Sequence, residues 1–167
     1  MHLVMKPKFT PNFNINDIRK VIVERVSLLE AETLSILKDI GGKFVRDARS
    51  TQTYKDRTGN LRHSIGFIIL KDGVQIFGNF QDPGFELIKD EDGKSKKLVG
   101  ATFGQKLAIT IGEQNPVGYV LIVVAGMSYA GYVEAKGYDV LTGSTLTAET
   151  NLKSELDFIS NALKGIR

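Results

Sequence analysis

The chain contains no cysteine and only two histidines, His2 and His63, among its 167 residues. Without cysteine there are no disulfides, no thiolate metal ligands and no cysteine nucleophile. Two histidines do not indicate a zinc or iron site, and no cofactor is expected. The longest apolar run, residues 120–125, is far shorter than the roughly 20 residues that cross a membrane. The N-terminal apolar run is likewise too short for a signal peptide. We therefore expect a soluble intracellular protein with no membrane partner.

The bulk composition is that of an ordinary globular domain. Hydrophobic residues make up 42% and charged residues 25% of the chain, both close to the usual shares. The length suits one domain with a buried core. The net charge of +3 is mild, whereas a nucleic-acid-binding protein more often has a dense basic face. Composition therefore favours one globular domain and does not indicate DNA binding.

Periodic apolar residues predict a long helix near the N-terminus. Residues 1–14 contain two prolines and are predicted to form an irregular arm. Asn14 or Asn16 is a suitable N-cap for the helix that follows. Apolar residues then recur at steps of three and four, through Ile18, Ile22, Val26, Leu29, Thr33, Ile36, Ile40, Phe44 and Ala48. Gly41-Gly42 interrupts this stripe, and because glycine weakens helices, we expect a break or kink there.

Apolar runs separated by turns predict an antiparallel sheet of about four strands. Residues 65–70 are apolar on both faces, and the Asp72-Gly73 pair predicts a hairpin to residues 74–80. Large apolar residues alternate over 107–111, which predicts a third strand. Residues 119–125 are predicted to supply the most buried strand.

The remaining segments complete an α+β domain. Residues 81–97 carry charges of both signs and are predicted to form a flexible charged loop. Tyr129 and Val133 stand four residues apart and predict a short helix after the last long strand. Residues 148–166 predict an amphipathic C-terminal helix. The fold class is therefore α+β, with a single domain over residues 15–167 after the arm.

No residue pattern indicates catalysis, and we expect a protein that is not an enzyme. Gly93-Lys94-Ser95 lacks the earlier glycine of a phosphate-binding loop, and residues 90–92 lack the spacing of a calcium loop. His63 and Ser64 are expected on opposite faces of a strand, so the histidine would not activate the serine. Glu134 has no second titratable group placed near it by the sequence. A carboxylate that accepts a backbone hydrogen bond or contacts a neighbouring subunit is the simpler interpretation.

Two segments resemble a family of phage assembly proteins. The first, Thr58 to Ile65, reads T-G-N-L-R-H-S-I, and the second, Tyr129 to Gly137, reads Y-A-G-Y-V-E-A-K-G. Together they resemble the neck, head–tail joining and tail-completion proteins of long-tailed phages, typified by gene product ten of a lambdoid siphophage. The long helix before the first segment and the terminal helix after the second are similar to the family layout. Residues 135–141 depart from the Gly-Thr and Pro-Phe-Leu-like pattern of relatives.

The resemblance implies a structural subunit that assembles as a homo-oligomeric ring between the portal-side connector and the tail. It implies assembly in the host bacterial cytoplasm and then a place at the head–tail junction of the virion. The residues that carry it are Thr58, Gly59, Leu61, Arg62, Ser64, Ile65, Tyr129, Ala130, Val133, Glu134 and Gly137. Lys94, Lys96 and Lys97 are candidates for an interface or for non-specific contact with passing DNA, although a solvated loop explains the same charges.

Two other function classes remain open. A pI near 9.0 and the basic loop suit a small nucleic-acid-binding α+β domain, whose affinity for DNA would fall steeply with salt. A hydrolase with an unrecognised site would show turnover on a panel of substrates. We also hypothesise that residues 50–60 and 81–97 become ordered only on assembly.

Overall fold

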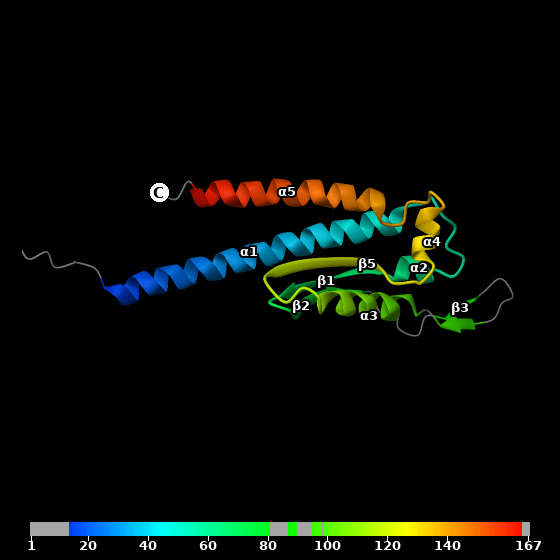
Figure 1. The fold of residues 1–167 in the computed structure, drawn as a ribbon, viewed down its shortest axis with the longest axis horizontal. Coiled ribbons are helices and arrows are strands. Elements are labelled where there is room, and N and C mark those ends of the chain that lie inside the picture. The colour runs from blue at the N-terminus through cyan, green and yellow to red at the C-terminus, as the bar shows by residue number, and fades with distance from the viewer. Residues whose placement is uncertain (1–13, 81–86, 90–94, 98, 165–167) are drawn as a thin grey trace, which may run out of the picture. The chain divides into compact units, whose positions relative to one another are not determined.

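The computed structural model describes residues 14–80, 87–89, 95–97 and 99–164. The predicted irregular arm therefore lies outside the described residues, apart from Asn14. The chain forms two compact units, residues 1–35 and 36–167, and each is described by itself. The second unit holds the sheet and the candidate site (Figure 1).

Helix α1 spans Ile15–Ser50 without a break. Asn14 is its N-cap, because the Asn14 side-chain oxygen accepts a hydrogen bond of 3.0 Å from the backbone N–H of Asn16. The predicted break at Gly41-Gly42 is wrong. A Cβ atom on Gly41 would lie 2.7 Å from the Phe67 ring, so this glycine lets the helix approach the sheet closely. The helix tolerates the propensity cost because tertiary packing offsets it.

The main sheet has three antiparallel strands in the order β2-β1-β5. Strand β1 spans Ile65–Lys71, β2 spans Val74–Asn79 and β5 spans Tyr119–Ala125. The predicted hairpin is confirmed, since Lys71 pairs with Val74 across the turn. The first six residues of β1 are buried, which is expected for a central strand covered on both faces. The most buried strand is therefore β1 and not, as predicted, β5.

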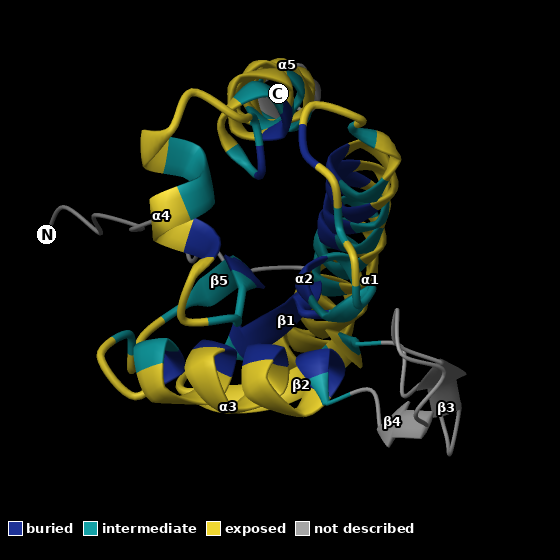
Figure 2. Ribbon diagram, turned by 90° about the vertical axis from the view of Figure 1, so that its right-hand side faces the viewer, coloured by how far each residue is buried: buried dark blue, intermediate teal, exposed yellow. Residues whose placement is uncertain are grey.

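Two helices cover the opposite faces of this sheet. On one face, Ile68 of β1 and Ile122 of β5 form a core cluster with Ala108. On the other face, Phe67 meets the part of α1 that belongs to the second unit. Figure 2 shows β1 as a buried ribbon, with the buried side of the helix over residues 100–112 turned towards it. The apolar character of both faces of β1 is thereby explained.

Residues 100–112 form a helix, and the predicted strand over 107–111 is wrong. Helix α3 spans Gly100–Gly112. Its buried positions recur at helical spacing and are all small, namely Gly100, Ala101, Gly104, Ala108 and Gly112. The large residues that suggested alternation, Leu107 and Ile109, are exposed. The face of α3 that packs on the sheet is therefore made of small residues. The predicted strand was inferred from the large residues instead.

Three more helices and a small sheet complete the structure over the described residues. Helix α2 spans Asn60–His63, α4 spans Ala130–Ala135 and α5 spans Thr142–Lys164. The short helix after the last long strand is thus confirmed, and the terminal helix begins six residues before the predicted 148. Within the predicted charged loop, β3 (Leu87–Lys89) and β4 (Ser95–Lys97) pair antiparallel in a separate sheet. The α+β class holds, with three strands in the main sheet where about four were expected.

The helices that the structure describes are not membrane spans. In the described parts of the chain, none combines the length and the apolar character that crossing a bilayer requires.

Candidate functional site

The two segments that carry the resemblance meet at one end of the main sheet. Helix α2, in the first segment, and α4, in the second, lie at that end in Figure 1. Ser64 ties the first segment to the residues just before the second, since its Oγ accepts a hydrogen bond of 3.3 Å from the N–H of Met127. Its carbonyl oxygen accepts a second, of 3.2 Å, from the N–H of Gly126. Ser64 is fully buried, so this junction is part of the core.

The first segment turns the chain from a polar connection into β1. Gly59 has a φ of 69°, in the left-handed region that favours glycine, and it precedes α2. Leu61 and Ile65 are buried, at 1% and 0% exposure, and anchor the turn in the core. The Asn60 side-chain oxygen accepts hydrogen bonds from the N–H groups of Val99 and Gly100, at 3.0 and 3.3 Å. Asn60 therefore caps α3, a role that the sequence interpretation did not assign.

Arg62 holds the polar connection before α2 in place. Its guanidinium donates a hydrogen bond of 2.9 Å to the carbonyl oxygen of Thr51. It also lies 5.5 Å from the ring centroid of Tyr54. The backbone N–H of Arg62 donates a hydrogen bond of 2.8 Å to the Asp56 carboxylate. These polar contacts of Arg62 are made within its own chain.

The second segment places a tyrosine against the first. Tyr129 stands at the N-cap position of α4, close to Thr58 of the first segment. Burial raises the pKa of the Tyr129 hydroxyl. Ala130 is buried and lets α4 sit close to its neighbours. Gly137, with a φ of 83°, follows the helix and turns the chain back.

The carboxylate of Glu134 organises the start of α5. It accepts hydrogen bonds from the N–H groups of Val140, Leu141 and Thr142 at 3.0, 3.1 and 3.2 Å, and from the Thr142 hydroxyl. Partial burial alone would raise the pKa of this carboxyl, but the hydrogen bonds, led by that of the Thr142 hydroxyl, lower it. A negative charge near a helix N-terminus also interacts favourably with the helix dipole and stabilises the helix. Glu134 thus serves as a capping residue here.

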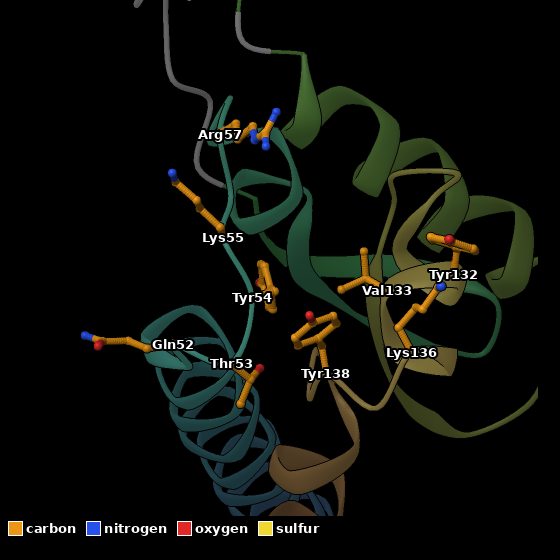
Figure 3. A pocket seen from close by; sticks show the side chains of 9 residues that line it. All are labelled: Gln52, Thr53, Tyr54, Lys55, Arg57, Tyr132, Val133, Lys136 and Tyr138. Carbon is orange, nitrogen blue, oxygen red and sulfur yellow. The ribbon is translucent and has the colours of Figure 1, made fainter. Parts of the chain in front are cut away.

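Two adjoining clefts lie between the polar connection and α4. The larger has a volume of about 670 Å³ and the smaller about 420 Å³. Tyr54, Lys55, Arg57 and Val133 line both. Figure 3 shows Tyr54 and Tyr138 approaching one another across the larger cleft, with Val133 beside them. Burial raises the pKa of the Tyr54 hydroxyl, and the nearby Arg62 partly offsets this rise. The hydroxyl makes no well-formed hydrogen bond to any described residue.

Other residues that the sequence singled out lie away from this junction or outside the described residues. Lys96 and Lys97 are in β4, and Lys94 lies outside the described residues. His63 and Ser64 do not stand on a strand, because His63 ends α2 and Ser64 caps it. The Ser64 hydroxyl donates to the Leu61 carbonyl at 2.7 Å. Among the described residues, no cluster of three or more acidic or histidine side chains could hold a metal ion.

Close-packed glycines position the junction, and the sequence interpretation missed them. A Cβ atom on Gly104 would lie 2.3 Å from the carbonyl oxygen of Ser64. One on Gly126 would lie 2.2 Å from the backbone nitrogen of Gly104. The four-residue spacing of Gly100, Gly104, Ala108 and Gly112 was the available signal. Comparison with models of known families, with curated proteins and with solved structures finds no match to this chain.

Proposed function

We propose that this chain is a structural virion morphogenesis protein of a long-tailed phage. It acts as a subunit of the neck or tail-completion ring that joins the DNA-filled head to the tail. Its partners are other copies of itself, the portal-side connector and a tail protein. The proposal starts from the resemblance carried by residues 58–65 and 129–137, and it is supported by the exposed apolar surface of α1.

The observation that carries the proposal is an apolar stripe on α1 within residues 1–35. Ile18, Ile22 and Val26 lie on one face of this helix, and their exposed fractions range from 42 to 55%. Ile15 and Leu28 add further exposed aliphatic surface. A contiguous apolar patch on a folded protein commonly marks an interaction site. Assembly with another copy would remove this surface from water.

Helix α5 adds apolar surface of the same kind. Leu146, Leu156 and Phe158 of this helix are exposed. Closed rings of identical subunits require two different surfaces, because each contact joins one patch to another. The α1 stripe supplies one such patch, and the proposed ring contact joins it to exposed apolar side chains of α5 on the next copy.

The closely packed, hydrogen-bonded junction suits a structural role. Buried Ser64, the Glu134 cap and the close-packed glycines hold both family-like segments in one place. Their polar groups bond to backbone groups of the same chain. Such residues keep a subunit in one shape, which a ring of repeated contacts requires. Lys96 and Lys97 remain candidates for contact with passing DNA.

The experiment that tests the function is deletion of the gene from the encoding phage or prophage, followed by electron microscopy of the lysate. The expected result is filled heads beside separate tails, or heads that have lost their DNA. Expression of the wild-type chain from a plasmid should restore joined particles. Normal infectious particles in the deletion strain would overturn the proposal.

A further inference from the structure

Tyrosine and basic side chains gather around the larger cleft beside α4. The cleft is lined by Tyr54, Tyr132, Tyr138, Lys55, Arg57 and Lys136, together with three uncharged residues. None of these nine described residues carries a carboxylate. Four of the five tyrosines of the chain line this cleft or the adjoining one. The site therefore combines flat aromatic surfaces with positive charge.

The aromatic rings divide into a buried floor and accessible walls. Tyr54 is buried, and its hydroxyl has no well-formed hydrogen bond among the described residues. Tyr132 and Tyr138 are 64% and 46% exposed, so part of each side chain is accessible to a ligand. The Lys136 ammonium lies 5.2 Å from the ring centroid of Tyr132, and Figure 3 shows that side chain extending towards it. Aromatic and cationic groups are thus paired within the site.

We propose that this cleft binds single-stranded nucleic acid. Bases would stack on the exposed faces of Tyr138 and Tyr132, and phosphates would contact Lys55, Arg57 and Lys136. Proteins that bind single strands without sequence preference combine these two features, a positively charged groove and aromatic stacking surfaces. The cleft volume of about 670 Å³ falls in the range of ordinary ligand sites.

The composition of the cleft favours nucleic acid over an acidic peptide. Protein–protein contact surfaces are enriched in tyrosine and arginine but depleted in lysine. Two of the three cations here are lysines, which serve well as point-charge partners of phosphate. Single-stranded DNA and RNA share the chemistry that the site would recognise. The inference does not depend on the proposed assembly role, because the cleft does not include the α1 stripe or Lys96 and Lys97.

The test is fluorescence anisotropy with the full chain and fluorescein-labelled ten-nucleotide probes, oligo(dT) in one arm and oligo(U) in the other. Binding to at least one probe is expected, with an affinity that falls as salt rises. Comparison of the two arms shows whether DNA or RNA is preferred. Saturable binding by neither probe at low salt would overturn the proposal.

Substitutions locate the binding. The double variant Lys55→Ala/Lys136→Ala should weaken binding and reduce the salt slope by about 1.4, the value for two phosphate contacts with a single strand. The matched control Lys106→Ala/Lys153→Ala removes the same charge from exposed positions outside the cleft. Tyr138→Ala should weaken binding about tenfold, the scale of one base–aromatic stack. Phe158→Ala is its control, since Phe158 is an exposed aromatic residue on α5.

The controls also define the outcomes that would refute the site. Equal weakening by the two double variants would show that diffuse charge, and not the cleft, holds the probe. Displacement of the probe by polyglutamate as effectively as by unlabelled oligonucleotide would show a site that responds to charge alone. Circular dichroism of each variant ensures that only folded proteins are compared.

Discussion

The Oγ atom of Ser64 accepts a hydrogen bond from the backbone N–H of Met127, which lies 63 residues further along the chain. The same hydroxyl donates to the Leu61 carbonyl oxygen at 2.7 Å. One buried side chain therefore connects the turn before β1 with the segment after β5. The two family-like segments owe their proximity to this contact and to the pairing of β1 with β5.

Replacement of Ser64 by alanine should destabilise the folded chain. The substitution leaves the Met127 N–H without its acceptor and removes one of the two hydrogen bonds to the Leu61 carbonyl. An unsatisfied buried group costs about 1–3 kcal/mol. Urea denaturation should show the loss as a lower midpoint. Ser154→Ala, at an exposed position of α5, is the control and should change little. A Ser64→Ala variant as stable as the wild type would contradict the role assigned to this hydroxyl.

Replacement of Gly104 by alanine should destabilise the contact between α3 and β1. The new Cβ would lie 2.3 Å from the Ser64 carbonyl oxygen and 2.6 Å from the Phe80 ring. Such overpacking typically costs about 1–3 kcal/mol. Gly131→Ala in α4 is a control of opposite sign, because a Cβ there has no neighbour within 4 Å. That substitution should stabilise the chain by up to about 1 kcal/mol. Thermal unfolding midpoints that move in the same direction would refute this explanation.

The Glu134 carboxylate should make the stability of the protein depend on pH in the acid range. Its pKa is lower in the folded chain than its ordinary value. The unfolded state therefore binds the proton more tightly, and stability falls as pH is lowered. The contribution is fully present above the ordinary value of about 4.3 and is lost as pH falls through the folded pKa.

Glu134→Gln should remove this part of the pH dependence and should cost about 1 kcal/mol near neutral pH, as the loss of a helix cap does. Urea denaturation between pH 3 and pH 7 measures both effects, with ~0.5 pH steps near the transition. Glu149→Gln, at an exposed position of α5, is the control for the loss of one negative charge. A Glu134→Gln profile parallel to that of the wild type would contradict the capping role.

Charges on the α1 stripe should block assembly without unfolding the subunit. The variant Ile18→Asp/Ile22→Asp introduces charge on side chains that are already exposed, so unfolding should change by only about 0.5 kcal/mol. In the complementation experiment it should fail to restore joined particles. Asn16→Asp/Ser27→Asp adds the same charge on the opposite side of the helix. This control should complement, and its failure would show that charge anywhere on α1 suffices to block assembly.

Local patterns predicted the elements whose large side chains repeat in register. Asn14 and the steps of three and four marked the start of α1. The run apolar on both faces marked β1, and Asp72-Gly73 marked its hairpin. Tyr129 and Val133 marked α4. In each case the residues that interact lie only a few positions apart, so a local period, a capping residue or a turn pair was sufficient.

Other features depended on distant parts of the chain. The alternation of Leu107 and Ile109 predicted a strand, but the glycines of α3 could pack against β1 only as a helix, because only then do they lie on one face. Gly41 acts as a contact with Phe67 and not as a helix breaker. The partners of Glu134 are three backbone N–H groups and the Thr142 hydroxyl, which come within reach of its carboxylate only once the chain has turned at Gly137.

The sequence by itself determined the helical and strand character of α1, β1, β2, β5 and α4, since these depend on residues a few positions apart. Only the tertiary structure decided that Ser64 meets Met127 and that tyrosines from separate segments line one cleft. The physical reason is distance along the chain. Contacts between residues far apart in sequence form only when the strands of the sheet pair, and neither periodicity nor propensity predicts them.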